Sequence, residues 1–302
     1  MTVRALTGLE LDAAGHLAAP PIAAPPSPPP LPSGRYVDVG GAFLWTVDTG
    51  SRDTGADDTW TRGDPVLLLH SGVGSVELWA HQLASLSRAG FRAMAYDRRG
   101  HGRSRDVGGA HDEAADALAI ADRLGLNTVH LVGVAQGARI ANQMAVRHPD
   151  RVRSLTLASS MAGVRLRGPQ GAGTAPILPE LFAKLPAWFR ELGPAYRAAD
   201  PEGVRRWIAV ESASADRLPP DGPPPGRIDP DALRALTCPV LLLTGDADPF
   251  LPPPMVRALA GCYADPSLVV LPECGHSPQW ERPDLFGLVL ETFLRTTPEP
   301  GG

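Results

Sequence analysis

The spacing of apolar residues along the chain predicts short strands that alternate with amphipathic helices. Val66–Leu69 is an uninterrupted apolar run, as expected of a parallel strand that is covered on both faces. Two strands joined at Gly40 and Gly41 form a predicted hairpin, and five more strands follow Val66–Leu69. In chain order, the other predicted strands are Arg35–Val39, Phe43–Val47, Phe91–Tyr96, Thr128–Val134, Val152–Ala158, Pro239–Leu243 and Leu268–Leu271.

Helices are predicted between these strands, because apolar residues recur there three and four positions apart. One helix carries Val76, Trp79, Leu83 and Leu86, and Gly90 ends it. The others are Asp112–Leu124, Gln136–His148, Met255–Tyr263 and a last helix with Phe286, Val289, Leu290 and Phe293 on one face. Strands that alternate with helices imply an α/β fold with a mostly parallel sheet and right-handed crossovers.

Two segments do not follow this alternation of strands and helices. Residues 1–34 are rich in proline, which forbids helix and favours extended chain, so we expect a tether or a packed arm. Residues 163–237 hold Pro-rich turns and short helical patches, and we expect them to form a small cap over the carboxyl edge of the sheet, where such folds place ligands. The predicted core is therefore residues 35–162 and 238–302.

Composition narrows the classes of partner. Hydrophobic residues make up 43% and charged residues 20% of the 302 residues, and the formal net charge is −5 with no basic run, which argues against nucleic acid. No apolar stretch approaches a membrane span, and Glu10 and Asp12 interrupt what would be the apolar region of a signal peptide, so we expect a cytoplasmic protein. Its expected partner is a small-molecule substrate, and the expected oligomeric state is a monomer or a homodimer. The three cysteines lack metal-ligand spacing, and the Gly-rich stretches lack a phosphate-binding lysine, so neither metal nor cofactor is expected.

Four segments at predicted strand ends carry candidate chemistry. Their sequences are Leu69-His70-Ser71-Gly72, Asp97-Arg98-Arg99-Gly100-His101-Gly102-Arg103-Ser104, Gly133-Val134-Ala135-Gln136-Gly137, and the pair Gly245-Asp246-Ala247-Asp248 and Gly275-His276. Together they resemble the α/β-hydrolase family, and the resemblance covers residues 62–296. It implies an eight-stranded, mostly parallel sheet flanked by helices, with the cap inserted after strand 6.

The resemblance also implies roles for individual residues. Gly133–Gly137 is similar to the family's Gly-x-Ser-x-Gly nucleophile elbow, and Ala135 stands in the position of the catalytic serine. Asp248, rather than Asp246, is identified with the acid and His276 with the base of a Ser-His-Asp triad. The backbone N–H groups of Gly72 and Gln136 are implied as the oxyanion hole.

Other candidates have weaker support in the sequence. Arg99 and His101 are expected to brace the turn that contains them rather than to contact substrate. Ser159 and Ser160 follow a predicted strand, but nothing places them on an elbow. Cap aromatics are expected to pack first and to line a pocket second, with Trp188, Tyr196 and Trp207 as candidates.

Two explanations of Ala135 remain open. In the first, the protein is a serine hydrolase of an ester, lactone, thioester or C–C bond in a small, moderately apolar organic molecule, and alanine is an inactivating substitution that leaves the chain nearly inactive. The sequence resembles enol-lactonase, meta-cleavage C–C hydrolase and small-ester hydrolase branches. In the second, alanine is natural, and His276–Asp248 serves as a base in a non-hydrolytic enzyme of the lyase, cyclase, decarboxylase or cofactor-free oxygenase type, with a place in secondary metabolism. A ligand-binding protein without activity is a third, weaker alternative.

Overall fold

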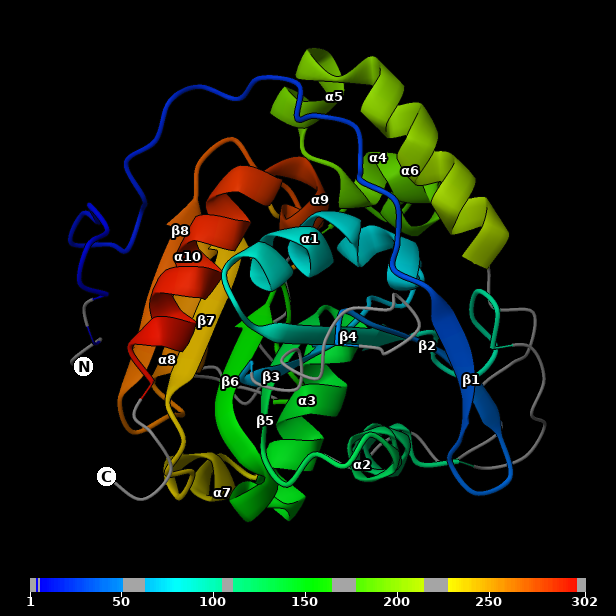
Figure 1. The fold of residues 1–302 in the computed structure, drawn as a ribbon. Coiled ribbons are helices and arrows are strands. Elements are labelled where there is room, and N and C mark those ends of the chain that lie inside the picture. The colour runs from blue at the N-terminus through cyan, green and yellow to red at the C-terminus, as the bar shows by residue number, and fades with distance from the viewer. Residues whose placement is uncertain are drawn as a thin grey trace.

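An eight-stranded sheet lies at the centre of the protein (Figure 1). The computed structural model describes residues 4, 6–50, 63–104, 111–164, 178–214 and 228–297. The strands are β1 (Gly34–Asp38), β2 (Phe43–Asp48), β3 (Pro65–Leu69), β4 (Arg92–Tyr96), β5 (Val129–Val134), β6 (Val152–Ala158), β7 (Val240–Gly245) and β8 (Pro266–Leu271). They lie in the order β1-β2-β4-β3-β5-β6-β7-β8.

The pairing within the sheet is mostly parallel. β1 pairs with β2, and β2 with β4, in antiparallel fashion, whereas every neighbouring pair from β4 to β8 is parallel. This arrangement confirms the fold class predicted from the sequence. It also brings the carboxyl ends of β5, β6, β7 and β8 to one edge of the sheet, so the loops that follow these strands are neighbours.

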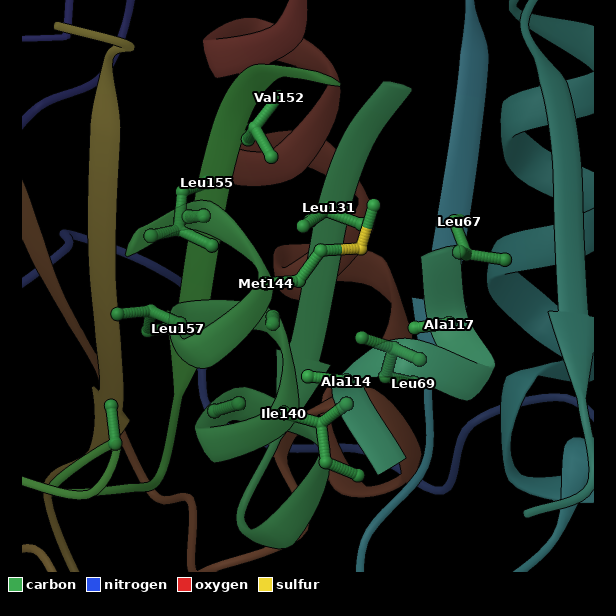
Figure 2. Close-up of a cluster of buried hydrophobic side chains, with 14 of the residues drawn as sticks. Leu67, Leu69, Ala114, Ala117, Leu131, Ile140, Met144, Val152, Leu155 and Leu157 are labelled. Carbon is green, nitrogen blue, oxygen red and sulfur yellow. The ribbon is translucent and has the colours of Figure 1, made fainter. Parts of the chain in front are cut away.

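Helices cover both faces of the sheet. The α-helices of the described residues are α1 (Ala80–Arg88), α2 (Glu113–Arg123), α3 (Gln136–Arg147), α4 (Ala187–Glu191), α5 (Pro194–Ala199), α6 (Pro201–Ser214), α7 (Pro230–Arg234), α8 (Pro253–Ala260), α9 (Pro278–Glu281) and α10 (Pro283–Arg295). Alternate residues of the buried strands point to opposite faces, so Val66 and Leu68 pack with α1 and α10, and Leu67 and Leu69 with α2 and α3. Figure 2 shows the second of these layers, in which Met144 of α3 lies among strand leucines and Ile140 lies beside Ala114 of α2. Both faces of β3 are thus buried, as its uninterrupted apolar run requires.

Helices α4, α5 and α6 lie between β6 and β7 in the chain and form a separate group beside α1 and α9 (Figure 1). They share a small apolar cluster with the core, made of Leu78, Leu192, Tyr196, Val204, Trp207 and Trp280. The described part of the predicted cap is residues 178–214 and 228–237; residues 165–177 and 215–227 of that prediction lie outside the described residues.

The proline-rich N-terminal segment packs on the core. Leu17 N–H donates to the carbonyl of Val270 at 2.9 Å, and Val270 N–H donates to the carbonyl of Gly15 at 2.8 Å, so this segment pairs with the outer edge of β8. It then runs in extended form past α9 and the α4–α6 group to β1 (Figure 1). Of the two expectations from the sequence, a packed arm describes residues 6–33.

Candidate active site

The turn between β5 and α3 has a strained backbone. Ala135 has φ 51° and ψ −110°, a conformation that side chains other than glycine rarely adopt. A methyl group added to Gly137 would lie 2.0 Å from the carbonyl oxygen of Leu69, and one added to Gly133 would lie 2.4 Å from the backbone nitrogen of Ala138. Only glycine fits at these two positions, so the chain can turn sharply and present the side chain of Ala135 at the edge of the sheet.

His276 and Asp248 form a hydrogen-bonded pair beside this turn. The Nδ1 atom of His276 lies 2.8 Å and 2.9 Å from the two carboxylate oxygens of Asp248. The carboxylate also accepts the backbone N–H groups of Phe250 at 2.8 Å and Leu251 at 3.0 Å, which fix its orientation. Asp246 instead accepts the backbone N–H of Cys274 at 3.1 Å. Of the two carboxylates, the structure brings Asp248 to His276 and places Asp246 against the backbone of Cys274.

The charges of this pair stabilise each other. Burial lowers the pKa of the His276 imidazole, but the charges of Asp248 and Glu191 and the hydrogen bond to Asp248 outweigh burial and raise that pKa to about 9. Burial raises the pKa of the Asp248 carboxyl, but the charge and hydrogen bond of His276 and two backbone N–H donors outweigh it, so that pKa is lowered. Each group of the pair thus favours the ionised form of the other.

The two predicted oxyanion donors lie next to each other. A methyl group added to Gly72 would lie 3.9 Å from Cβ of Gln136. The Gln136 side chain donates to Glu113 at 3.0 Å, Glu113 pairs with Arg98, and Arg98 donates to the carbonyl of Ser71 at 3.1 Å. One chain of partly buried polar groups therefore joins both loops from which the predicted donors come.

A cavity of about 270 Å³ opens beside the elbow. Its lining includes Ala135, Gln136 and His276, together with Arg139, Ser159, Ser160, Met161, Ala162, Gly163, Phe250 and Leu251. The Phe250 ring packs against the His276 imidazole in a tilted arrangement, with centroids 4.5 Å apart and 53° between the ring planes. Its size and its mixture of apolar and polar groups suit a small organic molecule.

The three cap aromatics proposed from the sequence lie elsewhere. Tyr196 and Trp207 are fully buried in the small apolar cluster that α4–α6 share with the core, here called the cap cluster, and Trp188 packs against that cluster. None of the three lines the cavity beside Ala135, whose aromatic wall is Phe250. A small cap has so little interior that its largest side chains are needed to fill it.

The site contains two further buried polar groups, the Glu191 carboxylate and the Ser159 hydroxyl. The sequence does not point to Glu191, and it gives only weak support for Ser159. The Oε2 atom of Glu191 lies 3.9 Å from Nε2 of His276 and has no hydrogen-bond partner among the described residues. Ser159 lines the cavity with φ 50° and a buried hydroxyl that likewise lacks a partner within the described part of the chain. The only sequence signal for Glu191 is a lone acidic residue in the short segment Ala187–Glu191, which does not reveal burial.

The structure shows no sign of metal or membrane sites where it describes the chain. No group of three or more His, Cys, Asp or Glu side chains in the described residues is arranged to hold a metal ion. Over the same residues, no helix has the length and apolar character that crossing a membrane requires. Cys238, Cys262 and Cys274 are all free.

Comparison with known proteins places the whole site within one family. The sequence profile of the Alpha/beta hydrolase family matches residues 66–286. A putative carbamate hydrolase, RutD, from Variovorax paradoxus is 32% identical over 265 residues, which cover 79% of this chain and 94% of that protein. A 2-hydroxy-6-oxononadienedioate/2-hydroxy-6-oxononatrienedioate hydrolase from Burkholderia vietnamiensis is 26% identical over 272 residues, which cover 79% of this chain and 90% of that one.

Solved structures share the same architecture. A thermophilic esterase from Thermogutta terrifontis has a TM-score of 0.69 at 25% identity and covers 88% of this chain and 98% of its own. The enol-lactonase from Burkholderia xenovorans LB400 has a TM-score of 0.65 at 22% identity and covers 86% of this chain and 99% of its own. The matched region of this chain, residues 66–286, includes the elbow and both loops that carry Asp248 and His276.

Proposed function

Because the chain belongs to the alpha/beta hydrolase family, we propose that its site is built to hydrolyse a small, moderately apolar organic molecule at an ester, lactone, thioester or C–C bond. The family relationship and the hydrolases among its relatives support the general class. We further propose that hydrolysis would follow a Ser-His-Asp mechanism, for which Ala135 lacks the nucleophile oxygen.

The observation that carries this proposal is the strained elbow. Alanine at φ 51° and ψ −110° costs of order 1–3 kcal/mol of backbone strain. In a serine hydrolase this geometry exposes the nucleophile to the base and to the oxyanion donors. A methyl group has no catalytic role that would require this strained conformation. The retained strain therefore supports a site in which only one oxygen atom separates the chain from a complete triad.

The expected mechanism follows from the positions of the three partners. A hydroxyl on residue 135 would attack the substrate carbonyl carbon, and Nε2 of a neutral His276 would accept the hydroxyl proton. Asp248 would hold Nδ1–H and so fix the ring's tautomer and orientation. The negative oxygen would rest on the N–H groups of Gly72 and Gln136, and protonated His276 would return its proton to the leaving group as the acyl-enzyme forms. Water would then hydrolyse the bond to residue 135 and release the acid. The chain as it stands lacks the attacking oxygen, so it is expected to be nearly inactive as a hydrolase.

The decisive experiment is the substitution Ala135→Ser. We expect the variant to hydrolyse activated aryl esters and to be labelled by a fluorophosphonate, with a gain of up to about 10⁶ in turnover. The matched control, Ala135→Ser combined with His276→Gln, should lose both properties while keeping the fold by circular dichroism. A folded Ala135→Ser variant that neither turns over nor labels at any pH between 6 and about 10, a range set by the position of the His276 pKa, would contradict the proposal.

A second candidate is favoured by the buried carboxylate of Glu191 beside His276. With alanine in place, the imidazole faces a carboxylate rather than a hydroxyl, an arrangement suited to moving protons to and from a carbonyl compound without an acyl-enzyme. This reaction would be of the lyase, cyclase, decarboxylase or cofactor-free oxygenase type. It predicts that the unmodified chain exchanges the acidic C–H of a bound carbonyl compound with D₂O once His276 has lost its Nε2 proton and can serve as the base. Loss of exchange in His276→Gln supports this candidate, and unchanged exchange points to binding alone.

A further inference from the structure

Glu191 faces the nitrogen of His276 that is not engaged by Asp248. Its Oε2 atom lies 3.9 Å from Nε2, whereas Asp248 lies 2.8 Å from Nδ1, so the imidazole stands between two carboxylates. The Glu191 side chain is about nine-tenths buried and its Oε2 has no other partner among the described residues. A buried carboxylate without a hydrogen-bond donor is costly, so its position beside an imidazolium calls for an explanation.

The backbone fixes this carboxylate in place. His276 N–H donates to the carbonyl of Glu191 at 2.8 Å, so the end of α4 is tied directly to the histidine loop. Two residues on, Gly193 N–H donates to Glu281 at 2.8 Å, and the same carboxylate accepts Gly275 N–H at 2.9 Å. A methyl group on Gly193 would lie 2.7 Å from the nitrogen of Gly275. The cap and the histidine loop are thus in close backbone contact, and Glu191 has little freedom to turn away.

The charges around the pair favour a proton between them. His276 is faced by Asp248, Glu191 and Glu281, all of them carboxyl groups. Burial raises the pKa of the Glu191 carboxyl, Asp248 and Glu211 add to this rise, and the charges of His276 and Arg190 oppose it. His276 is the stronger of the two cations that act on Glu191, and the raised pKa of His276 favours the proton on that ring.

We propose that Glu191 is a positioning residue that keeps a proton on Nε2 of His276. The inference deepens the proposed function, since Glu191 acts through the same histidine. A protonated Nε2 is a proton donor and not a base. In the unmodified chain, it can donate its proton to negative charge that develops on a bound carbonyl compound, and Glu191 together with Asp248 stabilises the positive charge of the ring until that transfer. Activation of a hydroxyl at position 135, in contrast, requires the proton to leave first.

The first test measures the protonation of His276 without any substrate. Protein labelled with ¹⁵N-histidine is titrated by NMR, and the His276 signals are assigned by their absence in His276→Gln. We expect Glu191→Gln to lower the pKa of His276 by at least about one pH unit, because an opposite charge within 4–6 Å has this effect. Glu211→Gln, which removes a carboxylate of α6 that is not among the groups raising the His276 pKa, is the matched control and should leave the titration nearly unchanged. An unchanged titration in Glu191→Gln, or an equal shift in Glu211→Gln, would overturn the inference.

The second test uses the rate of fluorophosphonate labelling against pH. In Ala135→Ser, labelling should rise with pH as His276 loses its proton, with a midpoint near its pKa of about 9. Adding Glu191→Gln should move that midpoint to lower pH and speed labelling at pH 7 about tenfold for each pH unit moved. Because Gln keeps the size of Glu, a purely packing role would change the thermal stability but not the midpoint. Coincident midpoints would overturn the role of Glu191.

The two proposals fail in different ways. Absence of labelling at every pH contradicts the hydrolase proposal, but it leaves the NMR titration as a complete test of Glu191. Labelling with coincident midpoints, together with an unchanged titration, supports the hydrolase proposal and rejects the role of Glu191.

Discussion

At the scale of single residues, the site depends on buried charges that never reach the cavity. Arg98 pairs with Glu113, donates to the carbonyl of Ser71 at 3.1 Å, and lies 3.1 Å from Nε2 of His101 in the same turn. Glu113 accepts the side-chain amide of Gln136 at 3.0 Å. The next residue, Arg99, instead forms a two-pronged pair with Asp116, with both contacts at 2.6 Å. Two adjacent arginines thus form two buried ion pairs, and only one of them leads to the predicted oxyanion hole.

This difference predicts separate effects of two matched substitutions. Arg98→Met and Arg99→Met should each destabilise the fold by about 3–5 kcal/mol, because each leaves a buried or partly buried carboxylate without its partner. In the Ala135→Ser background, only Arg98→Met should also lower kcat, by about tenfold or more, since it releases the loops of Gly72 and Gln136. Denaturant unfolding and aryl ester kinetics measure the two effects. Equal kcat values in the two variants would show that the Arg98 network does not align the site.

Residue-level inference from sequence reached the motif but not this network. The sequence predicts a bracing role for Arg99 and His101, and the pairing of Arg99 with Asp116 fits that role. Arg98 received no role, because its partners Glu113 and Ser71 lie on other elements and become neighbours only when β3, β4 and α2 assemble. Glu191 was missed for the same reason.

At the scale of elements, the apolar pattern predicted strands better than their ends. β6 agrees with the prediction at both ends, since a polar residue or a sharp turn borders it on each side. β7 continues to Gly245, two residues beyond the predicted end, because Thr244 and Gly245 still pair with β8 despite their low apolar character. Helix α8 begins at Pro253, which suits a first turn because proline lacks the N–H that is unpaired there. The pairing of Gly15–Leu17 with β8 is too short for any periodic pattern to reveal.

The elbow makes a prediction at this scale, because its geometry depends on the close approach of β3, β5 and α3. Gly137→Ala should destabilise the protein by about 3 kcal/mol or more, since the added methyl group would meet the backbone oxygen of Leu69, which is fixed in the sheet. The control is Gly287→Ala in α10, where a methyl group would lie 3.7 Å from Ser85 Oγ, an ordinary contact. That change should be neutral or stabilise the helix by up to about 1 kcal/mol. Similar unfolding free energies for the two variants would contradict the proposed packing of the elbow.

At the scale of the whole molecule, the site forms where four segments of the chain meet. The elbow follows β5, Asp248 follows β7, His276 follows β8, and Glu191 comes from the cap. The order and spacing of the first three are visible in the sequence because the resemblance to the family fixes them. The fourth depends on how the cap docks on the histidine loop, through Gly193 and Gly275, and the family motifs carry no information on that contact.

The N-terminal arm acts at the same scale, because it joins distant parts of the molecule. It pairs with the edge of β8, and Arg282 on the core donates to the carbonyl of Pro20 at 3.3 Å. Further along, Ile22 packs against the cap cluster, and the arm ends in β1 at the opposite edge of the sheet (Figure 1). An unpaired edge strand offers a template for association with other chains, so the arm also covers a surface that promotes aggregation.

Leu17 provides a test of this role. Its side chain is 5% exposed in the core layer beside α10, so Leu17→Ala should lower the free energy of unfolding by about 2–3 kcal/mol. The matched control is Leu288→Ala, which removes the same atoms from a side chain that is 51% exposed and should cost less than about 0.5 kcal/mol.

If the arm is held as a unit, weakening it at Leu17 should also open its pairing with β8. The amide of Val270, which donates to Gly15, should then exchange with D₂O about tenfold faster, while amides of the central strand β5 change only in proportion to global stability. Val270 exchange that merely follows β5 would show that the arm covers the edge of β8 without protecting it.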